Sequence, residues 1–137
     1  MWWIWALLSA FFAALTAIFA KIGIQGVDTD LATAIRTVVI LVLAWSIAVF
    51  RGGVATIGTL SRQNILFLCL SGVATGLSWI FYFKALQIGK VSQVAPVDKM
   101  SVAIAIVLSA LLLHEPISLK TALGALLIVG GTLVLIL

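Results

Sequence analysis

The sequence predicts an all-α protein, a polytopic membrane bundle of five transmembrane helices. Hydrophobic residues make up 64% of the 137 residues and charged residues only 9%, whereas a soluble domain carries roughly 25% charged residues. The mean hydropathy is +1.34. The apolar residues form five continuous runs, each close to the roughly 20 residues that a helix needs to cross about 30 Å of hydrocarbon. A β-barrel is excluded because its strands would show short alternating segments.

These runs occupy almost the whole chain, so we expect one transmembrane domain over residues 1–137. The expected spans are residues 2–22, 31–50, 64–88, 91–113 and 118–137. The connections between them are too short for an extramembrane domain, and the lipid bilayer is the expected partner of most of the surface. A nucleic-acid partner is not expected, because the eight Lys and Arg residues are scattered among apolar runs and form no basic stripe.

Aromatic and acidic residues bound the first two spans. Trp2, Trp3 and Trp5 begin the first span and fit either an interfacial aromatic belt or direct contact with lipid. No Lys or Arg precedes them, so a cleaved signal peptide is not expected. Asp28 or Asp30 can cap the second span, because a carboxylate accepts hydrogen bonds from the free N–H groups of a first helical turn.

The third span carries two patterns. Gly72 and Gly76 form a GxxxG pair, and small residues at this spacing let helices approach closely in lipid. Near the end of the span, Trp79, Tyr82 and Phe83 share one helical face. Their rings predict either an aromatic wall that holds a cation or a flat apolar solute, or ordinary core packing.

The fourth span begins with the polar segment 92–99, where Pro96 is expected to break the helix. If the helix begins at Val91, the proline releases the carbonyl of Ser92. If the helix begins at Pro96, residues 91–95 are irregular backbone, which is tolerated in a membrane only inside protein or beside a water-filled cavity. Either form is typical of a transporter site. Pro116 and Ser118 then separate this span from the fifth.

Four ionisable side chains lie within the expected spans, where such groups are costly and are candidates for function: Arg36, Lys84, Asp98 and Lys99. A buried carboxylate needs a cation beside it, and Arg36 or Lys84 is expected to pair with Asp98. Asp98 also shares a helical face with small residues that are expected to mediate helix packing, namely Ser101, Ala105 and Ser109. The charged pair either binds substrate or only holds helices together.

We therefore predict a substrate-binding set that combines these charges with nearby polar and aromatic side chains. Its members are Asp98, Lys99, Lys84, Arg36, Trp79, Tyr82 and Gln93. Catalytic chemistry is not expected, because Cys69 is the one cysteine and His114 the one histidine. The chain thus offers neither a nucleophile–base pair nor a cluster of metal ligands, and we predict no enzyme activity, no cofactor and no metal.

The cations are divided almost evenly between the two sides of the membrane. Arg51, Arg62 and Lys120 lie on the side of the N-terminus, and Lys21 and Lys90 lie on the other. The cations within the helices lie toward that second side. Such a balance defines no orientation by the positive-inside rule. The chain inserts either in one orientation or in both, and dual insertion of an odd number of spans would give an antiparallel homodimer with the inverted-repeat plan of many transporters.

Several short motifs carry a family resemblance: Ala85-Leu86, Val94-Ala95-Pro96, Leu113-His114-Glu115-Pro116 and the run 124–131. They resemble the EamA domain of the drug/metabolite transporter superfamily, most strongly over residues 79–134. Typical members carry two five-span repeats in inverted orientation, and this chain looks like one such repeat, a half-size member. The Asp98-Lys99 pair is not part of the family pattern.

The resemblance implies a secondary transporter, an exporter in our expectation, that moves small metabolites by alternating access as an antiparallel homodimer. It implies that the fourth span, which holds Asp98, lines the central cavity. Arg36, Lys84 and Lys99 favour an anionic or zwitterionic metabolite. Two alternatives stay open: a non-transporting membrane subunit or half of a heterodimeric transporter, and part of a lipid-linked-sugar flippase. The expected location is the cell (inner) membrane of a prokaryote, with several spans.

Overall fold

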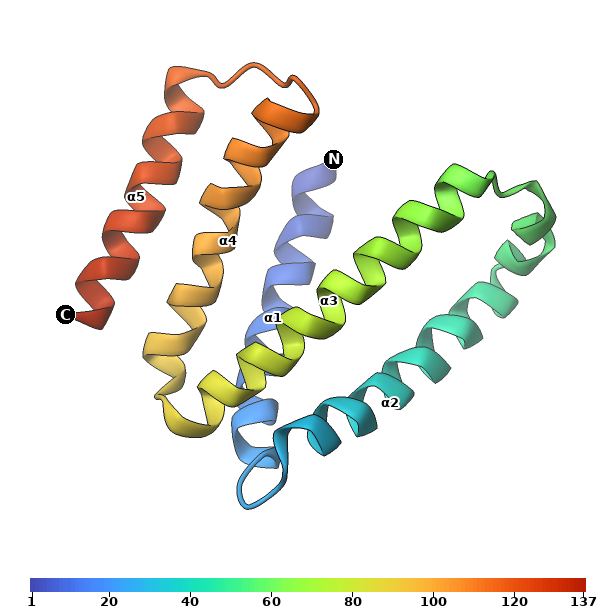
Figure 1. Cartoon of the computed structure of the whole chain (residues 1–137), viewed down its shortest axis with the longest axis horizontal. Helices are drawn as coiled ribbons and strands as arrows, with labels where there is room; N and C mark the ends of the chain where they lie inside the picture. The colour runs from blue at the N-terminus through green and yellow to red at the C-terminus, as the bar shows by residue number, and fades with distance from the viewer. The chain divides into compact units, whose positions relative to one another are not determined.

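The computed structural model describes all residues from Met1 to Leu137 and contains only helices and their connections (Figure 1). The elements in chain order are α1 (Trp2–Gly23), α2 (Thr29–Phe50), the 3-10 helix η1 (Gly53–Thr59), α3 (Arg62–Ile88), α4 (Val91–Leu112) and α5 (Leu119–Ile136). Each of the five α-helices is long and apolar enough to cross a membrane. The prediction of an all-helical chain with five spans is confirmed.

Side-chain caps set where three of the helices begin. Asp28 Oδ1 accepts hydrogen bonds of 3.0 Å from the backbone N–H groups of Asp30 and Leu31, so α2 begins at Thr29 rather than at residue 31. Ser61 Oγ accepts from the N–H of Asn64 at 3.0 Å. Ser118 Oγ accepts from the N–H of Thr121 at 3.1 Å and caps α5, as its sequence position indicates. Each cap satisfies N–H groups that a helix leaves open.

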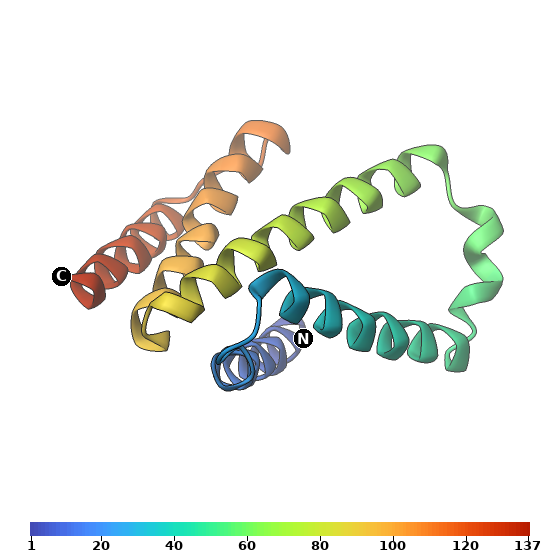
Figure 2. The same ribbon diagram turned by 60° about the horizontal axis from the view of Figure 1, so that its bottom comes forward.

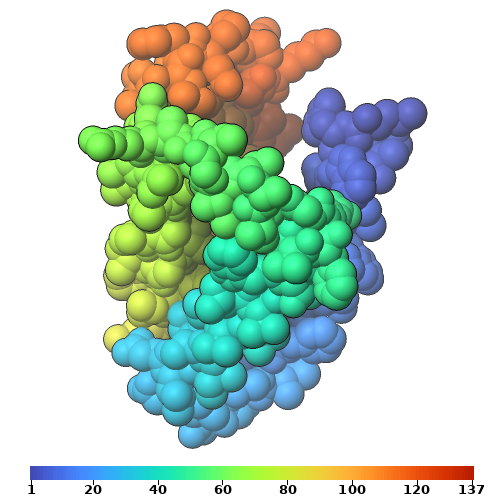
Figure 3. Space-filling view, turned by 90° about the vertical axis from the view of Figure 1, so that its right-hand side faces the viewer, coloured from blue at the N-terminus to red at the C-terminus, as the bar shows by residue number.

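The connection between α2 and α3 contains η1, a short helix that no periodic pattern in the sequence indicates. Gly52 precedes it at φ +73°, a left-handed conformation that glycine adopts without strain. Within η1, the Thr56 hydroxyl donates to the Gly53 carbonyl and the Thr59 hydroxyl to the Thr56 carbonyl, both at 2.7 Å. The helix lies against the C-terminal end of α2 (Figure 3).

The chain forms two compact units, one made of Met1–Phe19 with Ile88–Leu137 and the other of Ala20–Gln87. In the first unit, α4 and α5 form an antiparallel hairpin and lie side by side (Figures 1 and 2). In the second unit, α2 and α3 converge at the end opposite η1 (Figure 2). Elsewhere most large apolar side chains are exposed, which fits a surface covered by lipid tails rather than by water.

The buried part of the Ala20–Gln87 unit lies where the α1–α2 connection meets the C-terminal end of α3. Ile24 and Leu86 are fully buried there. Phe83, about one turn before Leu86 on α3, is also buried. Lys21 Nζ donates to the backbone carbonyl of Leu86 at 2.6 Å. Gln87 Nε2 donates to the carbonyl of Val27 at 2.9 Å. Side chains of each segment thus satisfy carbonyl groups of the other, which holds this end of the unit together.

Candidate functional site

Arg36 and the aromatic face of α3 form one of two polar sites in the chain. The guanidinium carbon of Arg36, on α2, lies 4.4 Å from the ring centroid of Trp79 and 5.3 Å from that of Phe83. Trp79 and Phe83 are one turn apart on α3, so their rings face the same neighbour. Both distances are within the roughly 6 Å at which a cation is attracted to an aromatic face.

This arrangement combines the two interpretations of the aromatic face. Phe83 is buried and belongs to the core, which agrees with the interpretation of these rings as core packing. The rings also hold a cation, but that cation is the guanidinium of Arg36 and belongs to the chain itself. Tyr82 is half-buried, and its ring centroid lies 6.4 Å from that of Phe83. Lys84 is exposed on the next position of α3.

The hydroxyl groups near Arg36 on α2 bond to their own helix. Thr33 Oγ1 donates to the carbonyl of Thr29, and Thr37 Oγ1 donates to the carbonyl of Thr33, both at 2.8 Å. The guanidinium itself makes contact with ring faces, and no buried side-chain nitrogen or oxygen lacks a hydrogen-bond partner. Arg36 is half-buried, so part of its side chain reaches the surface of this unit, where a ligand can meet it.

The second polar site lies on α4 around Pro96. The helix runs without interruption from Val91 to Leu112, with the proline inside it. The structure therefore has the first of the two expected forms, in which the helix begins at Val91 and the proline releases the carbonyl of Ser92. The helix tolerates this loss because a proline near its start releases only a carbonyl of the first turn.

Thr132 on α5 is a site residue that sequence reasoning missed. It is buried, and its hydroxyl donates to the carbonyl of Pro96 at 3.2 Å and to that of Ile128 at 2.8 Å. The bond joins α4 and α5 at the proline. The sequence does contain a signal for this contact. Pro96 and Thr132 lie at nearly equal distances along the chain from Glu115, so an antiparallel hairpin between the two helices places them side by side.

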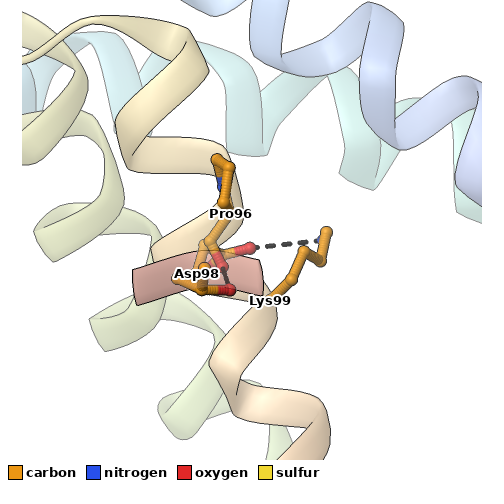
Figure 4. A network of polar contacts seen from close by, with 4 residues as sticks. Pro96, Asp98 and Lys99 are labelled. Carbon is orange, nitrogen blue, oxygen red and sulfur yellow. Dashed lines mark hydrogen bonds and ion pairs between the residues drawn. The ribbon is translucent and has the colours of Figure 1, made fainter. Parts of the chain in front are cut away.

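Asp98 pairs with its chain neighbour. Lys99 Nζ lies 3.3 Å from Asp98 Oδ2, with relative side-chain exposures of 59% and 36% for Lys99 and Asp98 (Figure 4). The expected partners, Arg36 and Lys84, belong to the other unit, and their pairing with Asp98 stays a prediction. Exposed pairs of this kind contribute roughly 0–1 kcal/mol in water, so the bond to Lys99 leaves the carboxylate available to a stronger partner.

Asp98 and the small residues that follow it lie on the side of α4 away from α5. Two residues advance a helix by about 200°, so Asp98 is nearly opposite Pro96, which contacts α5. Ser101 and Ala105 are exposed, and Ser109 is half-buried with its hydroxyl bonded to the carbonyl of Ile106 at 3.0 Å. In the hairpin, the expected packing through Ser101 and Ala105 is thus not made. Gln93 is exposed in the first turn of α4.

The side of α4 that faces α5 is apolar instead. An open hollow of about 290 Å³ lies along this seam and carries no charged side chain. It is lined by Met100, Ala103, Ile104, Val107, Leu108 and Val129. Asp98, Ser101 and Ala105 therefore lie on a different face of α4 from this apolar seam.

Gly72 and Gly76 show a similar separation on α3. A Cβ atom added at either glycine would meet no atom within 4 Å. The GxxxG face of α3 is therefore not used for packing within the unit that holds it, and it stays a prediction for contact with another helix.

Comparison with known proteins identifies the family. The model of the EamA-like transporter family matches residues 1–137, the full length of the sequence. The chain belongs to the EamA-like transporter family. This EamA-like chain is also 46% identical over 134 residues to a protein of Sinorhizobium sp named "Uncharacterized transporter in cobO 3'region". The alignment covers 98% of this chain and 95% of that relative. No solved structure matches the EamA-like chain significantly.

These findings make the chain a half-size EamA-like protein with several membrane spans, and a membrane transporter. The resemblance found in the sequence is confirmed. The chain has a single set of five helices. It is close in length to the Sinorhizobium relative, which is itself named as a transporter.

Proposed function

We propose that this EamA-like protein exports small metabolites from a prokaryotic cell across its inner membrane, by alternating access in an antiparallel homodimer. The observation that supports the proposal most is the position of Asp98. Its carboxylate is half-buried and lies on the face of α4 away from α5, next to exposed small residues. A carboxylate within an apolar span is costly unless it faces protein or a water-filled path.

In this proposal, the Asp98 face of α4 lines the path of the substrate. Lys99 adjoins Asp98 and is bonded to it, and Gln93 is exposed in the first turn of the same helix. Arg36 on α2 and Lys84 on α3 are proposed as further contacts to the substrate. Thr132 and Pro96 fix α4 against α5 on the opposite face, so the two helices can move as one rigid hairpin. Alternating access between two copies requires such rigid elements around a site near the middle of the membrane.

A flux measurement tests the role of Asp98. The purified chain is placed in liposomes, and efflux of radiolabelled metabolites is compared for the wild type, Asp98→Asn and the matched control Asp30→Asn. Asp30 is an exposed carboxylate in the first turn of α2. We expect the efflux rate of Asp98→Asn to fall at least about tenfold, equivalent to roughly 1.4 kcal/mol. We expect Asp30→Asn to keep the wild-type rate. Equal rates for the wild type and Asp98→Asn would refute a role for Asp98.

The antiparallel homodimer is tested by labelling one position in η1. In a Cys69→Ala background, Thr56→Cys places one thiol in the connection between α2 and α3. A membrane-impermeant thiol reagent is then applied to intact and to permeabilised cells. Labelling of about half the molecules from outside is the expected result of dual insertion. Labelling from a single side would contradict it and would direct the search to a different partner subunit.

A further inference from the structure

Arg36 is held on two ring faces while its N–H groups remain available. From this geometry we infer that Arg36 binds the carboxylate of the transported metabolite, so that the substrates are carboxylic acids or carboxylate-bearing zwitterions. The inference rests on the proposed transport function and names the chemical class of its substrate. It concerns one contact, between a carboxylate of the metabolite and the edge of the Arg36 guanidinium, whose flat face lies on the rings of α3.

The contacts with Trp79 and Phe83 leave the hydrogen-bonding capacity of Arg36 unused. A guanidinium stacks on a ring through its flat face, at 4.4 Å and 5.3 Å here, whereas its five N–H donors point outward in its plane. The nearby hydroxyls of Thr33 and Thr37 donate to carbonyl groups of α2. The carboxylate of Asp28 caps that helix. The polar groups closest to Arg36 along α2 are therefore committed elsewhere.

A carboxylate fits this arrangement better than other groups do. The planar fork of arginine donates two parallel hydrogen bonds to the two oxygens of a carboxylate, and such charged pairs are about twice as strong as neutral ones. The rings behind the guanidinium restrict its rotation, which lowers the entropy lost on binding. They also offer an apolar surface to the remainder of the metabolite. A neutral solute would leave the positive charge of Arg36 without a partner inside an apolar span.

The alternative is that Arg36 serves only to join α2 to α3. The two roles respond differently to Arg36→Lys. Lysine keeps the positive charge over the rings, so a purely structural contact is largely retained. It lacks the planar fork, so bidentate binding of a carboxylate is lost. We expect KM for a carboxylate substrate to rise about tenfold to a hundredfold in Arg36→Lys and more in Arg36→Gln, with the folded fraction unchanged in Arg36→Lys.

Flux measurements with two sets of labelled compounds test the substrate class. The full chain in liposomes is offered carboxylates (L-amino acids, pyruvate, succinate and citrate) and, separately, compounds without a carboxylate (amines, sugars and nucleosides). Arg62→Gln, at the exposed start of α3, is the control variant. The expected result is transport of at least one carboxylate, with the rise in KM limited to the Arg36 variants.

Two outcomes would overturn the inference and leave the proposed function standing. One is transport only of compounds without a carboxylate. The other is carboxylate transport with the same KM in the wild type, Arg36→Lys and Arg36→Gln. Transport of no compound from either set would instead remove the proposed function, together with the inference that rests on it.

The fluorescence of Trp79 gives a direct measure of binding that does not depend on flux. Changing Trp2, Trp3, Trp5 and Trp45 to Phe leaves Trp79 as the one tryptophan of the chain. A transported carboxylate that binds Arg36 changes the emission of Trp79 in a saturable way, and the corresponding amide does not. An equal response to the amide would contradict recognition of the carboxylate.

Discussion

The ammonium group of Lys21 donates a hydrogen bond of 2.6 Å to the backbone carbonyl of Leu86, a residue that is fully buried. The bond joins the end of α1 to the end of α3 within the Ala20–Gln87 unit. The last carbonyl groups of a helix carry partial negative charge and lack partners within the helix. A lysine from a distant segment therefore completes the C-terminal end of α3.

Loss of this bond lowers stability. We expect Lys21→Met to reduce the free energy of unfolding by about 1.5–3 kcal/mol, the range for a hydrogen bond to a charged group. Methionine keeps most of the aliphatic chain, so the loss reports on the ammonium group. Unfolding in mixed micelles with increasing SDS measures the effect. Lys120→Met, at an exposed position of α5, is the control, and an equal loss in both variants would contradict the assignment.

Thr132 supports the α4–α5 hairpin through its hydroxyl. Thr132→Val removes the bonds to Pro96 and Ile128 at nearly constant volume, and we expect a loss of about 1 kcal/mol in the free energy of unfolding. Thr132→Ser keeps the hydroxyl and should retain most of the stability. Thr75→Val is the control, because Thr75 is exposed and its hydroxyl bonds only within α3. Unchanged stability in Thr132→Val would show that the interhelical bond contributes nothing.

Pro96 leaves the first turns of α4 weaker than the remainder of the helix. In Pro96→Ala, the new N–H can donate to the carbonyl of Ser92, and we expect α4 to be stabilised by up to about 3 kcal/mol. Amide hydrogen exchange over residues 92–100 should slow accordingly. The matched variant Pro116→Ala, in the connection after α4, should leave these rates unchanged. Faster exchange in Pro96→Ala would contradict the prediction.

Gly72 and Gly76 are available for contact with a second copy. Because a Cβ atom added at either glycine meets no atom within 4 Å, we expect Gly72→Leu with Gly76→Leu to leave the folding of the single chain intact. If α3 meets another helix through this face, the same change should lower the dimer fraction in liposomes at least about tenfold. Single-molecule photobleaching counts the copies. Ala74→Leu, on another face of α3, is the control; an unaltered dimer fraction in the double variant would exclude this face from the interface.

The number and approximate bounds of the helices could be predicted from the sequence because lipid imposes a simple rule. Each span must be long, apolar and helical, and composition alone reveals that. The 3-10 helix η1 escaped prediction because its short run of small residues has no periodicity. The choice between Asp28 and Asp30 as the cap of α2 was likewise open, since the two residues are alike in type and the geometry decides between them.

The candidate sites were less accessible to prediction because each depends on contacts between distant segments. The sequence indicated that the aromatic face of α3 could hold a cation but not that Arg36 supplies it, since 43 positions separate Arg36 from Trp79. The pairing of Asp98 with Arg36 or Lys84 stays a prediction, and the structure adds a local partner, Lys99, its immediate neighbour. A pair between neighbouring residues costs little conformational entropy to form. An argument based only on which residues share a helical face does not predict such a pair.

The single exposed cysteine, Cys69 on α3, makes the wild-type chain suitable for spin labelling without any substitution. Cys69 lies six residues from the midpoint of α3, or about 9 Å along the helix axis. Two copies in opposite orientations would hold their nitroxides about 18 Å apart along the membrane normal, whereas two copies in the same orientation would hold them at one depth. Accessibility of the label to oxygen and to a nickel chelate would then show whether the sample contains one population or two.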